Sequence, residues 1–425
     1  MSVNKKLLII DVAALSKPIE SLGMEFRYAR SIFPALTSPV QGSFRTASQV
    51  GEHGIVANGM YFRQLGKVMF WEQSSRLLQG ERIWSQFRRR GGSVAMLFWQ
   101  QSFGEDVDVL LSPAPIHKHH GGMIEDCYSK PAGLYQRLCK IIGKPFKLRH
   151  YWGPMASEKS GEWISLATAA ILQEGDLSPD VCLTYLPTLD YALQRHGPDS
   201  PAADKAHAAL EEQLAYLLKV AQQQSYEVVI FGDYRIVPVS EAIFPNRILA
   251  DADLFKTRSV KDKLYPDFLH SKAFAVVDHQ IAHVYIQDES DIDAVRDIFL
   301  QLPGVADVMD IEAQRQAGIF HRNSGELLLL AEAGTWFAYP WWKDDRNKPD
   351  YASHVDIHNK PGFDPCELFW GWPPGSVSRD TSKVRGSHGM AGDENKVVWS
   401  ATIHFSRPID TLLDLAVAIR DWLEQ

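Results

Sequence analysis

Cysteines are few in this chain, and their spacing suggests no shared role. The 425 residues include only four, Cys127, Cys139, Cys182 and Cys366, with no Cys-x-x-Cys pair among them. A disulfide framework or a cysteine-based metal site needs closely and regularly spaced cysteines. The four thiols are therefore expected to be structural or incidental.

The sequence also lacks a long apolar run and an excess of positive charge. Its apolar segments end well before bilayer-spanning length, and residues 1–6 are too short and polar to begin a secretory signal. The 44 Lys and Arg residues are outnumbered by 52 Asp and Glu, for a formal net charge of −8. A chain without a basic field is not expected to bind duplex nucleic acid. We predict a cytoplasmic protein that does not span a membrane, and small anionic substrates are compatible with this charge.

The hydrophobic residues, 45% of the chain, follow an alternation of strand and helix patterns. Apolar runs typical of buried strands occupy residues 7–10, 94–99, 181–186 and 228–231. Between the last two runs, residues 202–224 carry leucine and alanine at helical spacing, as expected of a crossover helix between parallel strands. The pattern predicts an α/β fold with a doubly wound, parallel sheet.

A second texture begins near residue 245. Strand patterns at residues 273–277, 282–286, 304–309 and 327–331 enclose a helical pattern at residues 291–302. Residues 397–405 then return to a strand pattern, and a closing helix is expected over residues 409–424. We predict a core domain formed by residues 1–244 and 338–425, with residues 245–337 inserted as a small α+β subdomain that resembles a cap.

Three aspartates stand at the ends of predicted core strands. Asp11 ends the first strand, Asp190 follows residues 181–186, and Asp233 follows residues 228–231. The carboxyl ends of parallel strands lie along one edge, so three acids there repel each other unless a cation neutralises them. Any one of them alone is as compatible with a helix cap as with a ligand. Together they predict a metal site.

A hydroxyl group is predicted beside that edge. Thr37 is followed by Ser38 and Pro39, and the proline biases the preceding residue away from the α region. The chain therefore enters a following helix through a sharp turn that presents Thr37 at a helix N-terminus. A phosphoryl group is favoured at such a position.

These motifs, in this order, resemble one known family. They are Asp11, the Thr37-Ser-Pro turn, His53-Gly-Ile-Val-Ala-Asn58, Leu189-Asp190, the strand leading to Asp233, and Gly386-Ser-His388-Gly. Together they are similar to the type I phosphodiesterase and nucleotide pyrophosphatase branch of the alkaline phosphatase superfamily. The resemblance implies a three-layer α/β/α alkaline-phosphatase-like sheet, two divalent metal ions that are usually zinc, and a threonine nucleophile that attacks a phosphate ester.

Carried over residue by residue, the resemblance implies two metal subsites. The first consists of Asp11, Thr37 and Asp233, and the second includes Asp190 and His388. It also implies that Thr37 is the nucleophile and that Asn58 contacts a phosphoryl oxygen. A dication beside the threonine would lower its pKa, as it does that of water.

The chain departs from the family pattern at histidine positions. Gln194 stands where the family has histidine four residues after the second aspartate, and Tyr234 stands where histidine directly follows the third. The turn also reads Val40-Gln41 in place of Asn-His. Gln194 and Tyr234 thus occupy metal-ligand positions, although glutamine binds metal weakly and neutral tyrosine usually donates a hydrogen bond. Oxygen-rich subsites favour manganese or magnesium over zinc by ligand preference.

Two other segments are secondary candidates for ligands or phosphate contacts. Asp278 and His279 open the predicted insertion, and Asp356 and His358 lie in a stretch rich in Trp and Pro. The competing interpretation for His279, as for His283, is a histidine satisfied within a strand. For Asp356 and His358 the two interpretations are equally favoured.

The sequence therefore predicts a metal-dependent phosphoester hydrolase that acts through Thr37 on a small phosphorylated or phosphonate substrate. Two alternatives stay open. One is a phosphomutase-type transfer that returns the phosphoryl group to substrate, and the other is a non-catalytic family member that binds a phosphorylated ligand. Oligomeric state and the natural substrate do not follow from the residues.

Overall fold

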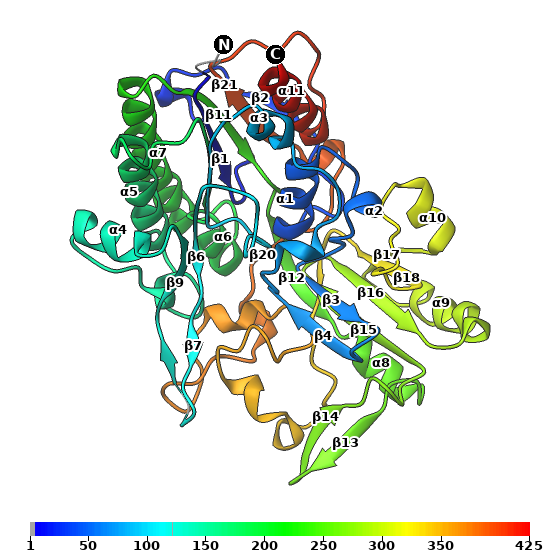
Figure 1. Cartoon of the computed structure of the whole chain (residues 1–425). Coiled ribbons are helices and arrows are strands. Elements are labelled where there is room, and N and C mark those ends of the chain that lie inside the picture. The colour runs from blue at the N-terminus through cyan, green and yellow to red at the C-terminus, as the bar shows by residue number, and fades with distance from the viewer. Residues whose placement is uncertain (1–4, 121) are drawn as a thin grey trace.

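A computed structural model describes residues 5–120 and 122–425 and contains an eight-stranded central sheet (Figure 1). In spatial order its strands are β2 (Arg27–Ala29), β21 (Val397–Ala401), β11 (Glu227–Gly232), β1 (Leu7–Val12), β10 (Val181–Leu186), β5 (Val94–Leu97), β6 (Val109–Pro113) and β9 (Cys127–Lys130). The five strands from β11 to β6 run parallel, whereas β21 and β9 are antiparallel to their inner neighbours. The predicted parallel core is confirmed, and the sheet as a whole is mixed.

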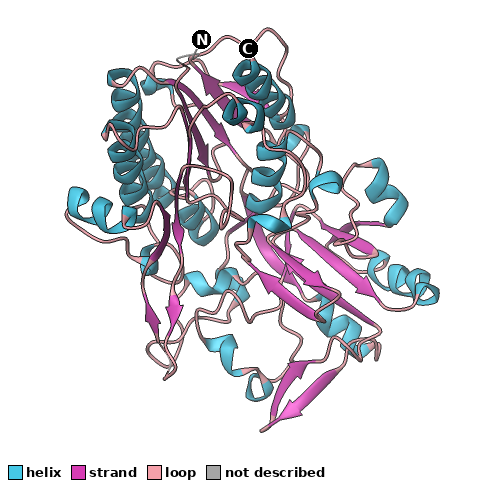
Figure 2. Cartoon of the chain, viewed as in Figure 1, coloured by secondary structure: helices cyan, strands magenta, loops and turns pink. Residues whose placement is uncertain are grey.

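Helices cover both faces of this sheet (Figures 1 and 2). One layer contains α4 (Leu134–Ile142), α5 (Lys159–Gln173), α6 (Asp190–His196) and α7 (Pro201–Gln223), and the other contains α1 (Thr37–Thr46), α3 (Ser85–Arg89) and α11 (Leu412–Glu424). The predicted crossover helix is α7, whose first turn is capped by the Ser200 hydroxyl, which accepts from the Ala203 N–H at 3.2 Å. No described helix has the length and apolar character needed to cross a bilayer.

The core strands are buried because their side chains are apolar on both faces. All six residues of β1 and of β10 are buried, and they join one large apolar cluster with the inner sides of the helices. Such two-sided burial is what an apolar run without alternation predicts for a strand in a covered parallel sheet. Asp11 is the exception in β1, because it is an acidic residue in a fully buried strand.

A second sheet of four antiparallel strands lies beside the first (Figure 1). Its spatial order is β15 (Ala273–Asp278), β16 (Ile281–Ile286), β18 (Leu327–Ala331) and β17 (Val305–Met309), accompanied by α9 (Ile292–Leu300) and α10 (Ile311–Gln316). Strands therefore form at all four predicted positions. The boundaries of the predicted insertion stay a prediction.

Shorter elements complete the fold. They are the three-stranded set β19 (Gly334–Phe337), β12 (Val237–Ile243) and β20 (Gly386–Ser387), the pairs β3 (Gly59–Phe62) with β4 (Lys67–Phe70), β13 (Thr257–Val260) with β14 (Lys263–Pro266) and β7 (Ile116–His117) with β8 (Met123–Ile124), and the helices α2 (Val50–His53) and α8 (Pro245–Asp251). At the turn between β15 and β16, the Gln280 N–H donates to the His388 carbonyl at 2.9 Å. The second sheet thereby reaches the edge of the first at the predicted site.

Gly232, the last residue of β11, allows a close chain crossing next to Asp233. A Cβ atom added there would lie 1.9 Å from the Leu15 carbonyl oxygen. We therefore expect Gly232→Ala to lower the free energy of unfolding by about 1–3 kcal/mol, the usual cost of overpacking, as measured by urea titration.

Gly175→Ala is the matched control, because a Cβ atom added at Gly175 meets nothing within 4 Å. Its urea midpoint should equal that of the wild type. Equal midpoints for both variants would show that the crossing at Gly232 is not as close as described.

Candidate active site

Three strand ends bring the predicted aspartates to one edge of the central sheet. Asp11 lies in register with Tyr185 of β10 and Phe231 of β11. Asp233 directly follows β11, and Asp190 is the first residue of the helix α6 that follows β10. The acids influence each other, since the negative charges of Asp11 and Asp190 contribute, after burial, to a pKa of Asp233 well above its ordinary value. The predicted convergence is therefore present in the structure.

Thr37 begins helix α1 beside this edge, as the proline turn predicts. Leu36 before it is extended, with φ −128° and ψ 150°, and the helix runs from Thr37 to Thr46. Few N–H groups of the first turn are free, because the Ser38 N–H donates to the Asn58 side-chain oxygen at 2.9 Å and Pro39 has none. The helix end thus presents a hydroxyl with few free amides around it.

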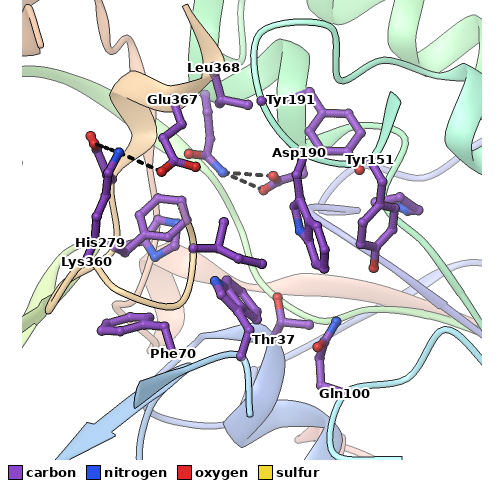
Figure 3. A pocket seen from close by; sticks show the side chains of 18 of the residues that line it. Thr37, Phe70, Gln100, Tyr151, Asp190, Tyr191, His279, Lys360, Glu367 and Leu368 are labelled. Carbon is purple, nitrogen blue, oxygen red and sulfur yellow. Dashed lines mark hydrogen bonds and ion pairs between the residues drawn. The ribbon is translucent and has the colours of Figure 1, made fainter. Parts of the chain in front are cut away.

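A small cavity opens in front of Thr37 (Figure 3). Its volume is about 90 Å³, several times the 10–15 Å³ that one water molecule requires. The predicted residues that line it are Thr37, Asp190, Gln194, Tyr234, His279, Asp356 and His388. Aromatic side chains such as Trp71, Tyr151 and Tyr191 form much of the remaining wall.

Asp11 is held by a buried glutamine. The Gln41 side-chain N–H donates to Asp11 Oδ2 at 2.8 Å, and the Gln41 side-chain oxygen accepts from the Gln100 backbone N–H at 2.7 Å. Asp11 Oδ1 has no hydrogen-bond partner. Burial raises the pKa of Asp11 to about 8, although the bond from Gln41 opposes the shift.

Asp233 is bound on one oxygen only. Its Oδ1 accepts from the backbone N–H groups of Ala14 at 3.1 Å and Tyr234 at 2.8 Å, while the buried Oδ2 has no partner. A carboxylate oxygen without a donor is costly in a buried place. Asp11 and Asp233 therefore each present one bare oxygen.

Asp190 differs from the other two acids because both of its oxygens are bonded (Figure 3). The Gln194 side-chain N–H groups donate to Oδ1 at 2.9 Å and to Oδ2 at 2.8 Å, and the Tyr234 hydroxyl donates to Oδ1 at 2.9 Å. Burial raises the pKa of Asp190, and these bonds oppose the shift. Burial also raises the pKa of Tyr234 well above its usual value, so the phenol stays a donor.

A stack of four rings runs from the sheet edge to the loop after β19. The Tyr234 and His388 rings are parallel within 3° at 3.6 Å, His279 follows at 3.8 Å from His388, and Phe363 lies 3.7 Å from His279. The imidazole of His388 is oriented by a bond of 2.8 Å between Nδ1 and the Ala35 carbonyl. Burial lowers the pKa of His388 well below its ordinary value.

The secondary candidates Asp278 and His279 lie at this stack. His279 occupies the β15–β16 turn with a φ of +60° and lines the cavity, so it is not the strand histidine of the competing interpretation. Its Nδ1 lies 2.8 Å from Asp278 Oδ1, and its buried Nε2 has no partner. Burial raises the pKa of Asp278 to about 6. By contrast, His283 is a satisfied strand residue, with Nδ1 accepting from the Gly325 N–H at 3.3 Å.

Asn58 uses its backbone and side chain in hydrogen bonds to Asp278 and Ser38. Its backbone N–H donates to Asp278 Oδ2 at 2.8 Å, and its side-chain amide donates to Asp278 Oδ1 at 3.2 Å. Since the side-chain oxygen also accepts from Ser38, Asn58 joins the start of α1 to the second sheet. Asn58 is buried and does not line the cavity, and its contact with a phosphoryl oxygen stays a prediction.

The other secondary pair is divided by the structure. Asp356 lines the cavity and accepts from the Asn359 backbone and side-chain N–H groups, whereas His358 is exposed and lies 3.2 Å from the Phe70 carbonyl. Neighbouring Lys360 is buried with Asp364 at 2.7 Å and Glu367 at 2.6 Å (Figure 3). Sequence reasoning missed this ion cluster, as it missed Gln41 as a support of Asp11. The i,i+4 spacing of Lys360 and Asp364 was the available signal.

The first predicted metal subsite fits a cation by its donor chemistry. Asp11 Oδ1 and Asp233 Oδ2 are bare and buried, and Thr37 adds a hydroxyl, which together form an oxygen set suited to manganese or magnesium. Across residues 5–120 and 122–425, no group of three or more His, Cys, Asp or Glu is placed to hold a metal, so a cation here would depend on the two carboxylates and the hydroxyl alone. The second subsite does not fit as it stands, since Asp190 already has three hydrogen bonds.

Comparison with known proteins adds a family and a fold. A family model described as type I phosphodiesterase / nucleotide pyrophosphatase matches residues 15–364. Curated proteins yield no significant match. Among solved structures, phosphonoacetate hydrolase from Sinorhizobium meliloti 1021 with phosphonoformate has a TM-score of 0.63 at 15% identity, covering 99% of this chain and 96% of that chain. Murine ectonucleotide pyrophosphatase / phosphodiesterase 5 has a TM-score of 0.57 at 15% identity, with 99% and 95% covered. These likenesses show an alkaline-phosphatase-like fold.

Replacing Gln41 tests the support of Asp11. Gln41→Leu would leave Asp11 Oδ2 and the buried Gln100 N–H without partners, so we expect a loss of about 1–3 kcal/mol or more in unfolding free energy. Gln222→Leu, on the exposed side of α7, is the matched control and should change stability little. Equal urea midpoints for the two variants would contradict the described role of Gln41.

The raised pKa of Asp11 predicts a pH dependence of stability. In metal-free protein this pKa is about 8, above the ordinary 3.8, so the folded state binds the proton more tightly than the unfolded chain does. Unfolding free energy should therefore fall as pH rises from about 4 to about 8, and Asp11→Asn should lose part of this fall. Urea titrations in chelator across this range measure it.

A cation at the first subsite should reverse that trend. Manganese is expected to stabilise the wild type more near the upper end of that range than near the lower end, because only the ionised acids bind it. Stabilisation that does not depend on pH would contradict this assignment.

Proposed function

The chain belongs to the type I phosphodiesterase / nucleotide pyrophosphatase family, and we propose that it hydrolyses a small phosphorylated or phosphonate substrate with Thr37 as the nucleophile. The observation that carries this proposal is the position of Thr37. It begins helix α1, lines the cavity, and belongs to the same sheet edge as the bare oxygens of Asp11 and Asp233.

The chemistry proposed for Thr37 is in-line displacement at phosphorus. Its Oγ attacks phosphorus as the hydroxyl proton is lost to solvent, the leaving group departs with the bonding electrons and takes up a proton, and a phosphoryl-threonine ester forms. Water then cleaves the P–O bond of this ester, which releases phosphate or, from a phosphodiester, a phosphate monoester, and restores the threonine hydroxyl group. The fixed start of α1, held to Asn58 through the Ser38 N–H, positions the nucleophile for both steps.

A cation at Asp11, Asp233 and Thr37 would supply the positive charge that this reaction needs. Metals in such sites lower the pKa of a bound hydroxyl and stabilise charge on the attacking and leaving oxygens. The protein wall itself does not supply that charge, because Lys360 is paired with Asp364 and Glu367. The family typically binds two metals, and the bare oxygens support the first.

The cavity and the structural neighbours favour small substrates. A space of about 90 Å³ in front of Thr37 suits a phosphoryl group with little attached to it inside the protein. One neighbour, phosphonoacetate hydrolase, was solved with phosphonoformate and with phosphonoacetate, and an inactive murine phosphodiesterase 5 was solved with AMP. A phosphonate or a small phosphodiester is therefore the substrate class proposed for this chain.

A second candidate function is binding of a phosphorylated ligand without turnover. It is favoured by Asp190, whose carboxylate is occupied by bonds from Gln194 and Tyr234 in positions where the family has histidines. A wild type that binds phosphate but releases no product from phosphonoacetate or generic phosphodiesters, with manganese or zinc added, would support this second candidate over hydrolysis.

Removing the nucleophile tests the proposed mechanism. Thr37→Ala should lower kcat by about three orders of magnitude or more, because the group that attacks phosphorus is removed. Product release from a chromogenic phosphodiester with added manganese measures it, and mass spectrometry of acid-quenched wild type should detect a phosphorylated Thr37.

Thr46→Ala is the matched control. Thr46 is the last residue of the same helix, its hydroxyl donates to the Gly42 carbonyl at 2.8 Å, and it does not line the cavity. This variant should keep wild-type kcat. Full activity of Thr37→Ala with metal content intact would exclude the covalent route.

A further inference from the structure

The three acids at the sheet edge differ in how many of their oxygens accept hydrogen bonds. Asp11 and Asp233 each keep one buried oxygen without a partner. Asp190 has donors on both oxygens, and all of them come from uncharged side chains. The carboxylates of the first subsite therefore each keep an oxygen without a hydrogen bond, whereas both oxygens of the carboxylate at the second subsite are bonded.

Gln194 is placed by the helix to donate to both oxygens of Asp190. The two residues are four apart on α6, so their side chains meet on one face of the helix. The glutamine amide spans the carboxylate, with Nε2 at 2.9 Å from Oδ1 and 2.8 Å from Oδ2 (Figure 3). Turning the amide over would set its Oε1, now buried without a partner, against the carboxylate oxygens, and two acceptors repel each other. The donor orientation is the one that the acid selects.

Tyr234 binds the same acid from the end of β11, which β1 separates from β10 in the central sheet. It follows Asp233 at the end of β11 and reaches across to donate its hydroxyl proton to Asp190 Oδ1 at 2.9 Å. Its ring lies flat on the imidazole of His388, 3.6 Å away and 3° from parallel. The phenol is thus fixed by stacking as well as by its hydrogen bond. It links the predicted ligands of the second subsite, Asp190 and His388, as a neutral group.

Hydrogen bonds of this kind compete directly with a cation for Asp190. A carboxylate with three short bonds from fixed neighbours must lose some of them before a metal can approach. The other predicted ligand of the second subsite is His388. Its Nδ1 is already hydrogen-bonded to the Ala35 carbonyl, so only Nε2 is left to bind a metal. By contrast, a cation at Asp11 and Asp233 would bind two oxygens that have no hydrogen bonds to break.

We propose that this chain binds a single divalent cation, at Asp11, Asp233 and Thr37, and that Gln194 and Tyr234 replace the second cation as hydrogen-bond donors to Asp190. The inference rests on the proposed function for the presence of the first cation. Its test counts bound metal, so that its failure can be told apart from failure of hydrolysis.

Manganese bound to the full chain gives the most direct count. Protein loaded with Mn²⁺ and freed of excess metal should hold one equivalent by elemental analysis. Its electron paramagnetic resonance spectrum should show the six-line signal of an isolated ion, because two ions about 4 Å apart would be spin-coupled. Asp11→Asn should lose this ion, whereas the matched Asp190→Asn should keep it.

Restoring histidines should create the missing subsite. Gln194→His combined with Tyr234→His removes all three bonds to Asp190, and we expect this double variant to bind a second equivalent and to show a coupled spectrum. Gln194→His alone keeps the tyrosine bond, so it should bind the second ion at least tenfold more weakly than the double variant. Thermal melting of each variant confirms that it is folded, and the single variant serves if the double variant does not fold.

The outcomes separate clearly. Two tight equivalents or a coupled spectrum in the wild type would overturn the inference, as would loss of the ion in Asp190→Asn, no bound ion in the wild type, or one equivalent in a folded double variant. A wild type with one ion and no turnover would leave the inference in place and contradict hydrolysis. A wild type with two ions and turnover would do the reverse.

Discussion

Repulsion among three buried carboxylates at one sheet edge is the constraint on which the rest of this structure depends. Parallel strands β1, β10 and β11 place Asp11, Asp190 and Asp233 so close that the charge of one raises the pKa of another. Bringing such groups together in a buried place is unfavourable unless protons, donors or a cation compensate. The surrounding residues can be understood by which compensation they supply.

Uncharged hydrogen-bond donors supply part of this compensation, and they come from the sheet and from both helical layers. Gln41 on α1 bonds Asp11, Gln194 on α6 bonds Asp190, and backbone N–H groups bond Asp233. The second sheet packs against the same edge through its β15–β16 turn. There His279 lies against the His388 ring, and Asp278 accepts from the Asn58 N–H. These donors leave bare one oxygen on each of two acids, and we propose that chemistry at phosphorus occurs there, beside the Thr37 hydroxyl.

Sequence patterns predicted the elements with simple periodicity and missed the contacts made across the fold. Apolar runs identified the core strands, and the Thr37-Ser-Pro turn identified the start of α1, because both depend on local sterics and burial. The strand predicted to reach residue 405 ends at Ala401, and the closing helix begins at Leu412 rather than near residue 409. The hydrogen bond from Gln41 to Asp11 could not be predicted from the sequence, because it depends on which strand packs beside helix α1. His279 looked like a strand residue, yet it occupies a turn with positive φ that only the packed structure reveals.

We propose that the protein compensates these three acids unequally, with a cation at two of them and hydrogen bonds at the third. Anomalous diffraction at the manganese edge, from crystals soaked with Mn²⁺ and vanadate, tests it most directly. We expect one anomalous peak within about 2.0–2.6 Å of oxygens from Asp11 and Asp233, with the Gln194 and Tyr234 bonds to Asp190 intact. A second peak bound by Asp190 and His388 would contradict it.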